Sequence, residues 1–270
     1  MSAQHSYPSA TPHLVAERDG AIGWLTFNRP ERMNAVSLEM WLAIPDLIDA
    51  LDRDPEVRVV VLTGAGDRAF VAGADISQFG ENRDDAKQAE AYERSNAGAF
   101  AAIRDCTKPT IAMIDGYCIG GGMAIALSCD MRIATLGSTF GIPAAKLGLA
   151  YPIAGMQQVL KAVPPSFAKE IFFTARQFDT DEALAMNLIN RVVEKGALEE
   201  ATRDICAQIA RNAPLTLRVA KHSIDSMSAQ PESFDRAAIE AMTKACFDSA
   251  DYAEGRQAFM EKRKPVFHGK

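Results

Sequence analysis

Short apolar blocks alternate with polar segments through the first two thirds of the chain, whereas apolar residues recur at helical spacing through the last third. Two of the blocks, 57–63 and 110–114, are rich in β-branched residues, which predicts buried strands. Further strands are expected at 14–17, 22–27, 131–134, 139–141 and 191–194. Helices are expected at 37–52, 85–105 and 123–128, with a short helix and a loop at 143–152. Strands that alternate with helices indicate a largely parallel α/β sheet, to which the last third adds a helical extension.

The same pattern divides the chain into three parts. Residues 1–12 carry neither the basic start nor the apolar core of a secretory signal, so we expect a short disordered leader. The α/β core is expected at 13–200 and the helical region at 201–270. Neither an internal repeat nor a low-complexity linker is visible in the sequence.

Composition and charge narrow the class of protein. The 270 residues are 48% hydrophobic and 24% charged, as in ordinary globular proteins, and no apolar run approaches the roughly 18 residues of a membrane span. The net charge of -6 disfavours nucleic acid as a partner, because phosphate binding requires a basic face. Five scattered cysteines without CxxC spacing argue against a disulfide framework and a zinc site. We therefore expect a cytoplasmic protein without a metal and without nucleic-acid or membrane partners.

The stretch 108–130 carries the strongest chemical signal. An expected strand at 110–114 is followed by Gly120-Gly121-Gly122 and by an apolar helix. At the start of a helix, unpaired N–H groups and the positive end of the helix dipole point outward. Such a turn is suited to hold an anion or a developing oxyanion.

Two other interpretations of the glycines are open. Residues 64–69 loosely match the dinucleotide pattern GxGxxA, but the segment that follows carries another glycine and no helical period. Residues 116–120 have the spacing of a nucleophile elbow, with Cys118 in place of serine. That site needs a histidine on a loop, whereas His222 lies within a helical run. We therefore expect Cys118 to be a small buried apolar residue.

A third interpretation joins the loop 70–76 to the turn 119–122. Each segment offers a backbone amide, and the small residues in both allow a carbonyl oxygen to approach closely. Two donors that face one carbonyl oxygen form an oxyanion hole.

These segments resemble the crotonase (enoyl-CoA hydratase/isomerase) superfamily, and the resemblance extends over residues 14–267. Its markers include Asn28-Arg29-Pro30, Asn34-Ala35, Ala72-Gly73-Ala74-Asp75-Ile76, Gly120-Gly121-Gly122, Phe140-Gly141-Ile142-Pro143 and Phe259-Met260-Glu261-Lys262-Arg263. The resemblance implies a ββα-spiral core, a C-terminal helical trimerisation region and a homotrimer or a dimer of trimers. It also implies an acyl-CoA substrate, with coenzyme A as part of the substrate rather than a separate cofactor.

By the same resemblance, the backbone amides of Ala74 and Gly121 hold the thioester carbonyl. The residues that the resemblance places against coenzyme A are Arg32, Met33, Ala72, Asp75, Ile76 and a tail lysine, Lys262 or Lys264.

The chain departs from the hydratase pattern at the two acid–base positions. Hydratases of the family carry a glutamate two residues after the third glycine of the turn and another after the later proline, whereas this chain has Ala124 and Ala144. General acid–base catalysis accelerates a reaction roughly 10²- to 10⁴-fold, and the chain has no obvious group in place of the two glutamates. Tyr151 resembles the methylmalonyl-CoA decarboxylase branch, in which the matching tyrosine lines the acyl pocket; a tyrosine that merely packs on the loop is the alternative.

The hypothesis that fits these residues is a lyase that decarboxylates a short 2-carboxyacyl-CoA through an enolate, because two amides stabilise an enolate without a carboxylate base. An enoyl-CoA hydratase or isomerase is one alternative. A non-catalytic subunit that binds CoA thioesters is another.

Overall fold

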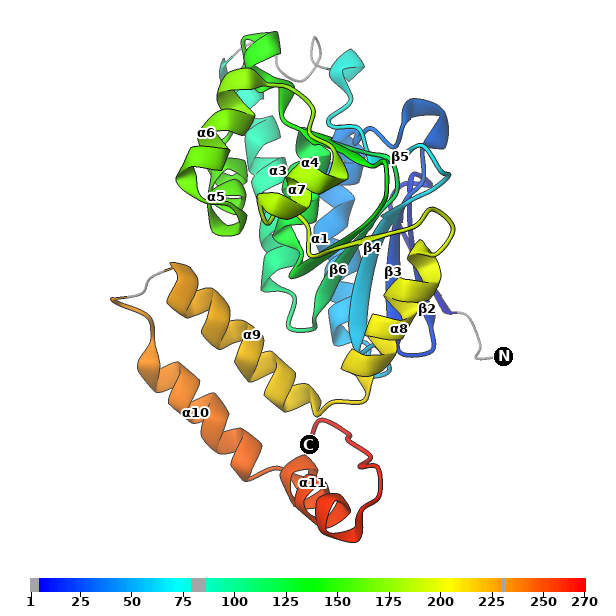
Figure 1. The fold of residues 1–270 in the computed structure, drawn as a ribbon, viewed down its shortest axis with the longest axis vertical. Coiled ribbons are helices and arrows are strands. Elements are labelled where there is room, and N and C mark those ends of the chain that lie inside the picture. Colours follow the sequence, from blue (N-terminus) through cyan, green and yellow to red (C-terminus); the bar gives the residue numbers. More distant parts are fainter. Residues whose placement is uncertain (1–4, 79–85, 230–231) are drawn as a thin grey trace.

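Two sheets form the core of the protein in the computed structural model, which describes residues 5–78, 86–229 and 232–270 (Figure 1). The larger sheet has the order β1 (His5–Tyr7), β2 (Leu14–Asp19), β3 (Ile22–Phe27), β4 (Val59–Gly64), β6 (Thr110–Ile114), β8 (Met131–Thr135) and β10 (Arg191–Val193). The smaller sheet has the order β5 (Ala69–Val71), β7 (Tyr117–Ile119) and β9 (Thr139–Gly141). β1, β2 and β3 pair antiparallel, and the other neighbours pair parallel.

Successive turns of the chain contribute to both sheets in the same way. In each turn, one strand enters the larger sheet and the next enters the smaller, so that β4, β6 and β8 run beside one another, as do β5, β7 and β9. This arrangement confirms the predicted spiral and its largely parallel sheet. The three-residue strands β5 and β7 were expected to be loop and turn, because segments this short show no period of their own.

Helices cover both faces of the larger sheet. The α-helices are α1 (Leu38–Arg53), α3 (Ala86–Asp105), α4 (Gly121–Ser128), α5 (Ile153–Ala162), α6 (Pro165–Thr174), α7 (Thr180–Ala185), α8 (Leu198–Ala210), α9 (Pro214–Ala229), α10 (Arg236–Phe247) and α11 (Ala250–Glu261). The 3-10 helices are η1 (Pro30–Arg32), η2 (Ile76–Gln78) and η3 (Pro143–Leu147). Along β4, Val60 and Leu62 face the core shared with α1, α3 and α4, whereas Val59 and Val61 face α8. Both faces are buried, which explains the continuous apolar run.

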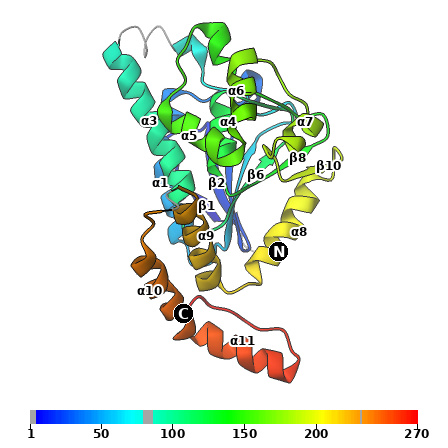
Figure 2. The same ribbon diagram turned by 60° about the vertical axis from the view of Figure 1, so that its left-hand side comes forward.

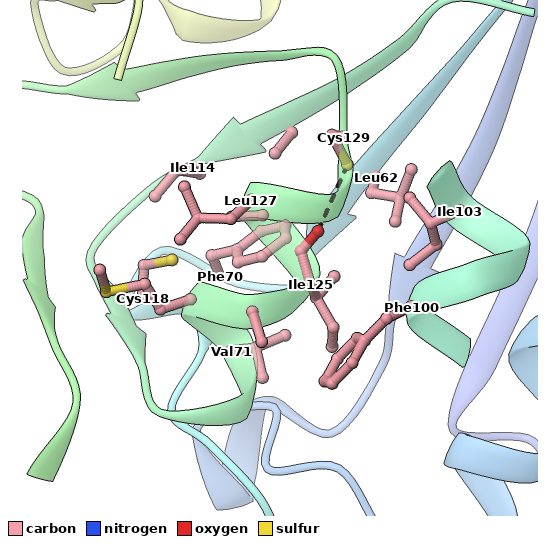
Figure 3. Close-up of a cluster of buried hydrophobic side chains, with 14 of the residues drawn as sticks. Leu62, Phe70, Val71, Phe100, Ile103, Ile114, Cys118, Ile125, Leu127 and Cys129 are labelled. Atoms are coloured by element: carbon pink, nitrogen blue, oxygen red, sulfur yellow. Dashed lines mark hydrogen bonds between the residues drawn. The ribbon is translucent and has the colours of Figure 1, made fainter. Parts of the chain in front are cut away.

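Helix α4 lies in the middle of the main core. All its residues from Gly122 to Ser128 are buried, as expected for a helix that is apolar all round. Figure 3 shows Ile125 and Leu127 of this helix among side chains from β4, β5 and α3. A β-carbon on Gly122 would lie 2.1 Å from the carbonyl oxygen of Val71, so glycine is required where α4 meets the end of β5.

The segment expected to be a disordered leader is ordered from residue 5 onward. β1 pairs with β2, whose edge would otherwise leave its backbone groups without partners. The hydroxyl of Tyr7 donates to Asp54 over 2.5 Å, and Thr11 is only 2% exposed. The prediction is therefore wrong for residues 5–12, while residues 1–4 lie outside the described part of the chain.

The C-terminal helices extend away from the sheets (Figures 1 and 2). The predicted boundary at residue 200 falls within α8, which packs against the larger sheet through Leu198, Ile205 and Cys206. The extension therefore begins after α8 and consists of α9, α10 and α11. In the described part of the chain, no helix is long and apolar enough to cross a membrane.

Candidate active site

A cavity of about 130 Å³ lies where the loops that follow β5, β7 and β9 meet helices α1 and α3. Its lining consists of Trp41, Ala72, Gly73, Ala74, Ile76, Asn96, Phe100, Ile119, Gly120, Gly121, Ile142, Pro143, Ala144, Leu147, Leu149, Ala150, Tyr151, Pro152 and Gly155. None of the described Asp, Glu, His, Lys or Arg side chains belongs to this lining. Nor do the described residues contain a group of His, Cys, Asp and Glu that could hold a metal.

The loop after β5 leaves the N–H of Ala74 without a backbone partner. Val36 donates to the carbonyl of Gly73 over 2.9 Å and accepts from the N–H of Asp75 over 2.9 Å. This parallel bridge skips Ala74, whose own N–H faces away from Val36. Within the described residues it has no hydrogen-bond acceptor.

The turn after β7 presents a second N–H beside the first. Gly120 donates to the carbonyl of Gly141 over 2.8 Å and has a φ of 56°, which favours glycine. Gly121 is the first residue of α4, so its N–H has no partner within the helix. A β-carbon on Gly121 would lie 3.6 Å from the nitrogen of Ala74 and 3.1 Å from the ring of Trp41. The two backbone amides therefore lie side by side at the cavity.

A buried asparagine holds the surrounding loops together. Asn34 is fully buried in a left-handed conformation with a φ of 56°, which asparagine tolerates better than most residues. Its side-chain oxygen accepts from the N–H of Arg29 over 2.9 Å. Its amide nitrogen donates to the carbonyls of Ala65 and Ala69 over 2.9 and 2.7 Å. The turn before α1 is thereby fixed to the β4–β5 connection.

Tyr151 is bonded to the turn that carries Gly121. Its hydroxyl donates to the carbonyl of Gly120 over 3.2 Å, and its ring packs against Phe172 with 5.2 Å between ring centroids. Burial raises the pKa of the phenol, and the buried thiol of Cys118 adds to the effect. The phenol is therefore neutral at physiological pH, and it supports the glycine turn through its hydroxyl as well as its ring.

The two alanines at the acid–base positions differ in their surroundings. Ala144 lies in η3 and lines the cavity, whereas Ala124 is fully buried within α4 and does not. Neither position supplies a group that can transfer a proton.

Most residues predicted to contact coenzyme A gather at the mouth of the cavity. Ala72 and Ile76 belong to the lining, and the side chain of Ile76 is 63% exposed. The N–H of Ala72 donates to the carbonyl of Met33 over 3.0 Å, which places Met33 and the exposed Arg32 beside the same loop. No described contact tests whether these residues bind coenzyme A, so that role stays a prediction.

Asp75 points into the protein rather than into the cavity. It accepts hydrogen bonds from the side chains of Arg29 over 3.0 Å and Ser77 over 2.6 Å. Burial alone would raise the pKa of this carboxyl, but the hydrogen bonds from Ser77 and Arg29 outweigh burial and lower it. The side chain of Asp75 therefore fixes the loop that carries Ala74.

The tail lysines lie at the other end of the molecule. Lys262 and Lys264 follow α11, which both views place far from α4 (Figures 1 and 2). Within one chain these two side chains do not belong to the cavity lining. Their predicted contact with coenzyme A therefore requires a second copy of the protein.

Among the lining residues that were missed at the level of sequence are Trp41, Asn96 and Phe100. The indole nitrogen of Trp41 donates to the hydroxyl of Tyr92 over 3.0 Å, and its ring meets Phe100 edge to face with 5.5 Å between centroids. Tyr92, Asn96 and Phe100 follow one another at four-residue spacing, so they share one face of α3. This spacing was the available signal, because it places an amide within an otherwise apolar face.

The structure also decides the other interpretations of the glycines. β4 ends at Gly64 and is followed by strand β5, so the GxGxxA pattern does not open a helix as a dinucleotide site requires. Cys118 has no exposed surface, and burial raises the pKa of its thiol. It is the buried apolar residue that the sequence predicts, and not a nucleophile.

Comparison with known proteins agrees with this architecture. The family model described as enoyl-CoA hydratase/isomerase matches residues 17–270. The chain is 34% identical over 258 residues to a short-chain-enoyl-CoA hydratase of Clostridium acetobutylicum, covering 93% of this chain and 96% of the relative. It is 35% identical over 263 residues to a crotonyl-CoA hydratase of Syntrophomonas wolfei, covering 97% and 100%.

A solved structure gives the same result for the fold. The crystal structure of an enoyl-CoA hydratase/carnithine racemase from Magnetospirillum magneticum superimposes with a TM-score of 0.91 at 37% identity, covering 97% of each chain. This likeness confirms the predicted crotonase fold. The chain therefore belongs to the enoyl-CoA hydratase/isomerase family, the crotonase superfamily, and is an enzyme that acts on acyl-CoA thioesters.

Proposed function

We propose that the cavity takes the acyl group of a short acyl-CoA and that the N–H groups of Ala74 and Gly121 donate to its thioester oxygen. The observation that carries this proposal is the pair of adjacent backbone amides, neither of which has an acceptor within the described residues. Removal of one such donor in an oxyanion hole slows catalysis by about 10²- to 10³-fold. The positive end of the α4 dipole adds to the stabilisation of an enolate.

The size of the cavity supports a short acyl group. Its volume of about 130 Å³ is close to that of engineered protein cavities, of about 150 Å³, that bind benzene. A four-carbon acyl chain fits such a space.

Hydration of a 2-enoyl thioester, or its reverse, is the reaction that the relatives favour. Both relatives, which match over nearly their whole length, are named hydratases of short enoyl-CoA thioesters. Addition of water puts a hydroxyl on the β-carbon and a proton on the α-carbon by way of a thioester enolate, which the two amides would stabilise.

One observation favours a second candidate reaction. The uncharged lining offers no carboxylate to activate water, whereas loss of CO2 from a 2-carboxyacyl-CoA needs only stabilisation of the enolate left behind. A carboxylate at Ala144 would also repel the negative substrate. Decarboxylation therefore remains the alternative to hydration.

A panel of thioesters distinguishes these reactions. Purified protein is assayed with crotonyl-CoA for loss of the conjugated enoyl absorbance, and with malonyl-CoA and methylmalonyl-CoA for release of CO2. Turnover of crotonyl-CoA alone identifies a hydratase, and turnover of the malonyl thioesters alone identifies a decarboxylase. Binding without turnover indicates a non-catalytic subunit, and absence of binding contradicts the proposal.

We also propose that the protein is a homotrimer or a dimer of trimers. Phe259 and Met260 of α11 are 85% and 82% exposed, and large apolar side chains exposed to this degree are typical of surfaces that another protein covers. Such an assembly would also be required to bring Lys262 or Lys264 to the coenzyme A of a neighbouring copy.

A further inference from the structure

A cleft lies between α9 and the core, apart from the candidate active site. Its volume is about 460 Å³, and side chains of α9 form one of its walls. The other wall is formed by the C-terminal ends of α3, α4 and α5 and by the start of β8. No described residue lines both this cleft and the cavity beside α4. The α9 cleft is therefore a separate place in which a ligand could bind.

Arg132 of β8 brings to the α9 cleft a positive charge that has no carboxylate partner. The residue is only 8% exposed. Its Nε donates to the carbonyl of Leu188 over 2.7 Å, and its Nη1 donates to the carbonyl of Cys129 over 2.9 Å. Its Nη2 has no acceptor within the described residues and is not sealed from solvent. Burial lowers the pKa of this guanidinium, yet arginine stays charged at neutral pH. Buried charges are normally paired, so this exception needs an explanation.

Gln158 of α5 is a second polar side chain that the fold leaves unpaired in the α9 cleft. The residue is only 3% exposed, and its amide makes no hydrogen bond to another described residue. Its amide atoms are not sealed from solvent, and the residue lines the α9 cleft, so the amide opens there. Lys161 lies three residues further along the same helix and lines the same cleft. The wall formed by the core therefore offers free hydrogen-bond donors from two elements.

Positive charge exceeds negative charge in this part of the cleft. Asp130 is bound by Lys221, whose Nζ lies 2.9 Å from its carboxylate. Asp225 lies on α9 rather than on the core, and burial raises the pKa of its carboxyl by disfavouring the charged form. Neither Arg132 nor Lys161 forms an ion pair with a described carboxylate. An anion is thus the ligand that these two side chains would attract.

Much of the remaining lining is apolar. Leu127, Met131, Ile209, Leu217 and Ile224 contribute to it, and Ile224 is 65% exposed. A purely inorganic anion would leave these side chains in contact with water. A ligand that carries a hydrocarbon group beside its negative charge would cover them.

We propose that the α9 cleft binds an organic carboxylate with an apolar body. Arg132 and the amide nitrogen of Gln158 donate to the carboxylate, and the hydrocarbon lies against Leu217 and Ile224. A guanidinium matches a carboxylate in geometry, and such charge-assisted hydrogen bonds are roughly twice as strong as neutral ones. This inference does not depend on the proposed reaction, because the cavity beside α4 takes no part in it.

The test measures the affinity of the full chain for simple probes. Dissociation constants are determined by calorimetry for hexanoate, for the uncharged hexanamide and for inorganic phosphate. We expect the wild type to bind hexanoate with a Kd of about 1 mM or tighter. Hexanamide and phosphate should each bind about tenfold more weakly, because one lacks the charge and the other lacks the hydrocarbon. Saturating butyryl-CoA should not displace hexanoate.

Two neighbouring glutamines provide a matched pair of variants. Gln158→Leu should weaken hexanoate about tenfold, since it removes a hydrogen bond to a charged group. Gln157→Leu is the control, because Gln157 is exposed on the same helix and does not line the α9 cleft. Arg132→Lys should also weaken hexanoate about tenfold, because lysine lacks the planar fork. If Arg132→Lys does not fold, Gln158→Leu decides the matter.

Several outcomes would overturn the inference. It is wrong if the wild type does not bind hexanoate, if hexanamide binds equally well, or if phosphate binds more tightly than hexanoate. Equal affinities of Gln158→Leu and Gln157→Leu would likewise refute it. Displacement of hexanoate by butyryl-CoA would place the probe in the cavity beside α4 and would contradict a separate site. None of these results bears on the proposed acyl-CoA reaction, which is measured by turnover.

Discussion

Two apolar pockets in the described part of the chain differ in character. The cavity beside α4 is small, about 130 Å³, and its walls are strands, turns and helices packed into the main core. The groove among α9, α10 and α11 is larger, about 790 Å³, and residues at its edge such as Phe259 remain mostly exposed. Similar apolar side chains therefore line a small cavity within the core in one region and an exposed groove in the other. The two regions differ because contacts within one chain hold the backbone in place around the cavity but not around the groove.

Close backbone contacts fix the walls of the cavity. Gly122 lies against the carbonyl of Val71 at a distance that excludes any side chain, and Asn34 connects the neighbouring loops. In contrast, α9 and α10 contain no buried residue. Helices of this kind gain most of their stability from packing, so we expect another surface to cover the C-terminal region.

The largest effect is expected when one of the two backbone N–H groups at the cavity is removed. Gly121→Pro should lower kcat by about 10²- to 10³-fold for the thioester that the wild type converts, because one of the two donors is lost. Proline is tolerated at the first position of a helix, so circular dichroism and the oligomer mass should stay unchanged. Gly98→Ala is the control, since a β-carbon there meets nothing within 4 Å. Full activity of Gly121→Pro would refute the role of the amide pair.

A second substitution tests the exposed groove. Phe259→Asp combined with Met260→Asp should convert the assembly into monomers, since each buried side chain of this size contributes about 1.5–3 kcal/mol. Light scattering after size exclusion gives the mass. Leu42→Asp is the control because Leu42 is also exposed, at 60%, but lies on α1 of the core. A wild type that is itself monomeric would contradict the expectation.

The ion pair that fixes the cavity loop predicts a dependence on pH. The pKa of Asp75 is lowered in the folded protein, so its stabilising contribution is present above the unfolded value of about 3.9 and is lost as pH falls through the folded value. Asp75→Asn should cost about 1–2 kcal/mol at neutral pH. Thermal unfolding measured from pH 7 to pH 3 should show that the difference in stability between the wild type and Asp75→Asn disappears below about pH 4. A stability difference that stays constant with pH would show that the charge of Asp75 does not contribute to stability.

The smallest effect is expected at the phenol beside the glycine turn. Tyr151→Phe removes the hydrogen bond to the carbonyl of Gly120 and should cost about 0.5–1.5 kcal/mol of stability. Hydration should slow less than tenfold, because the hydroxyl acts through the turn. A much larger loss, confined to decarboxylation, would show that the phenol contacts the substrate. Tyr117→Phe, on an exposed tyrosine of β7, is the matched control.

Much of the fold was predictable because its elements carry their own pattern. The strand at 110–114 has the predicted bounds. The two glycine-containing segments were paired from their small residues, whereas the choice of Ala74 and Gly121 within them came from the family resemblance. β1, β5 and β7 were missed although β9, which is equally short, was predicted at 139–141; three residues carry little pattern, and the pairing of these strands comes from neighbours elsewhere in the sequence. Asn96 was missed for a related reason: an amide in a helix acquires meaning only when the side chains around it are known.

The C-terminal extension is attached to the core at both of its ends. α8 holds the start of the extension, and at the far end Arg58 donates to the carbonyl of Phe267 over 2.6 Å. Asp251, only 3% exposed, accepts from the N–H groups of His268 and Gly269 and so anchors the returning tail to α11. Because α9, α10 and α11 are attached at both ends, they move together with the core. The extension therefore keeps a fixed orientation relative to the core, and an assembly built on α11 would take its geometry from that orientation.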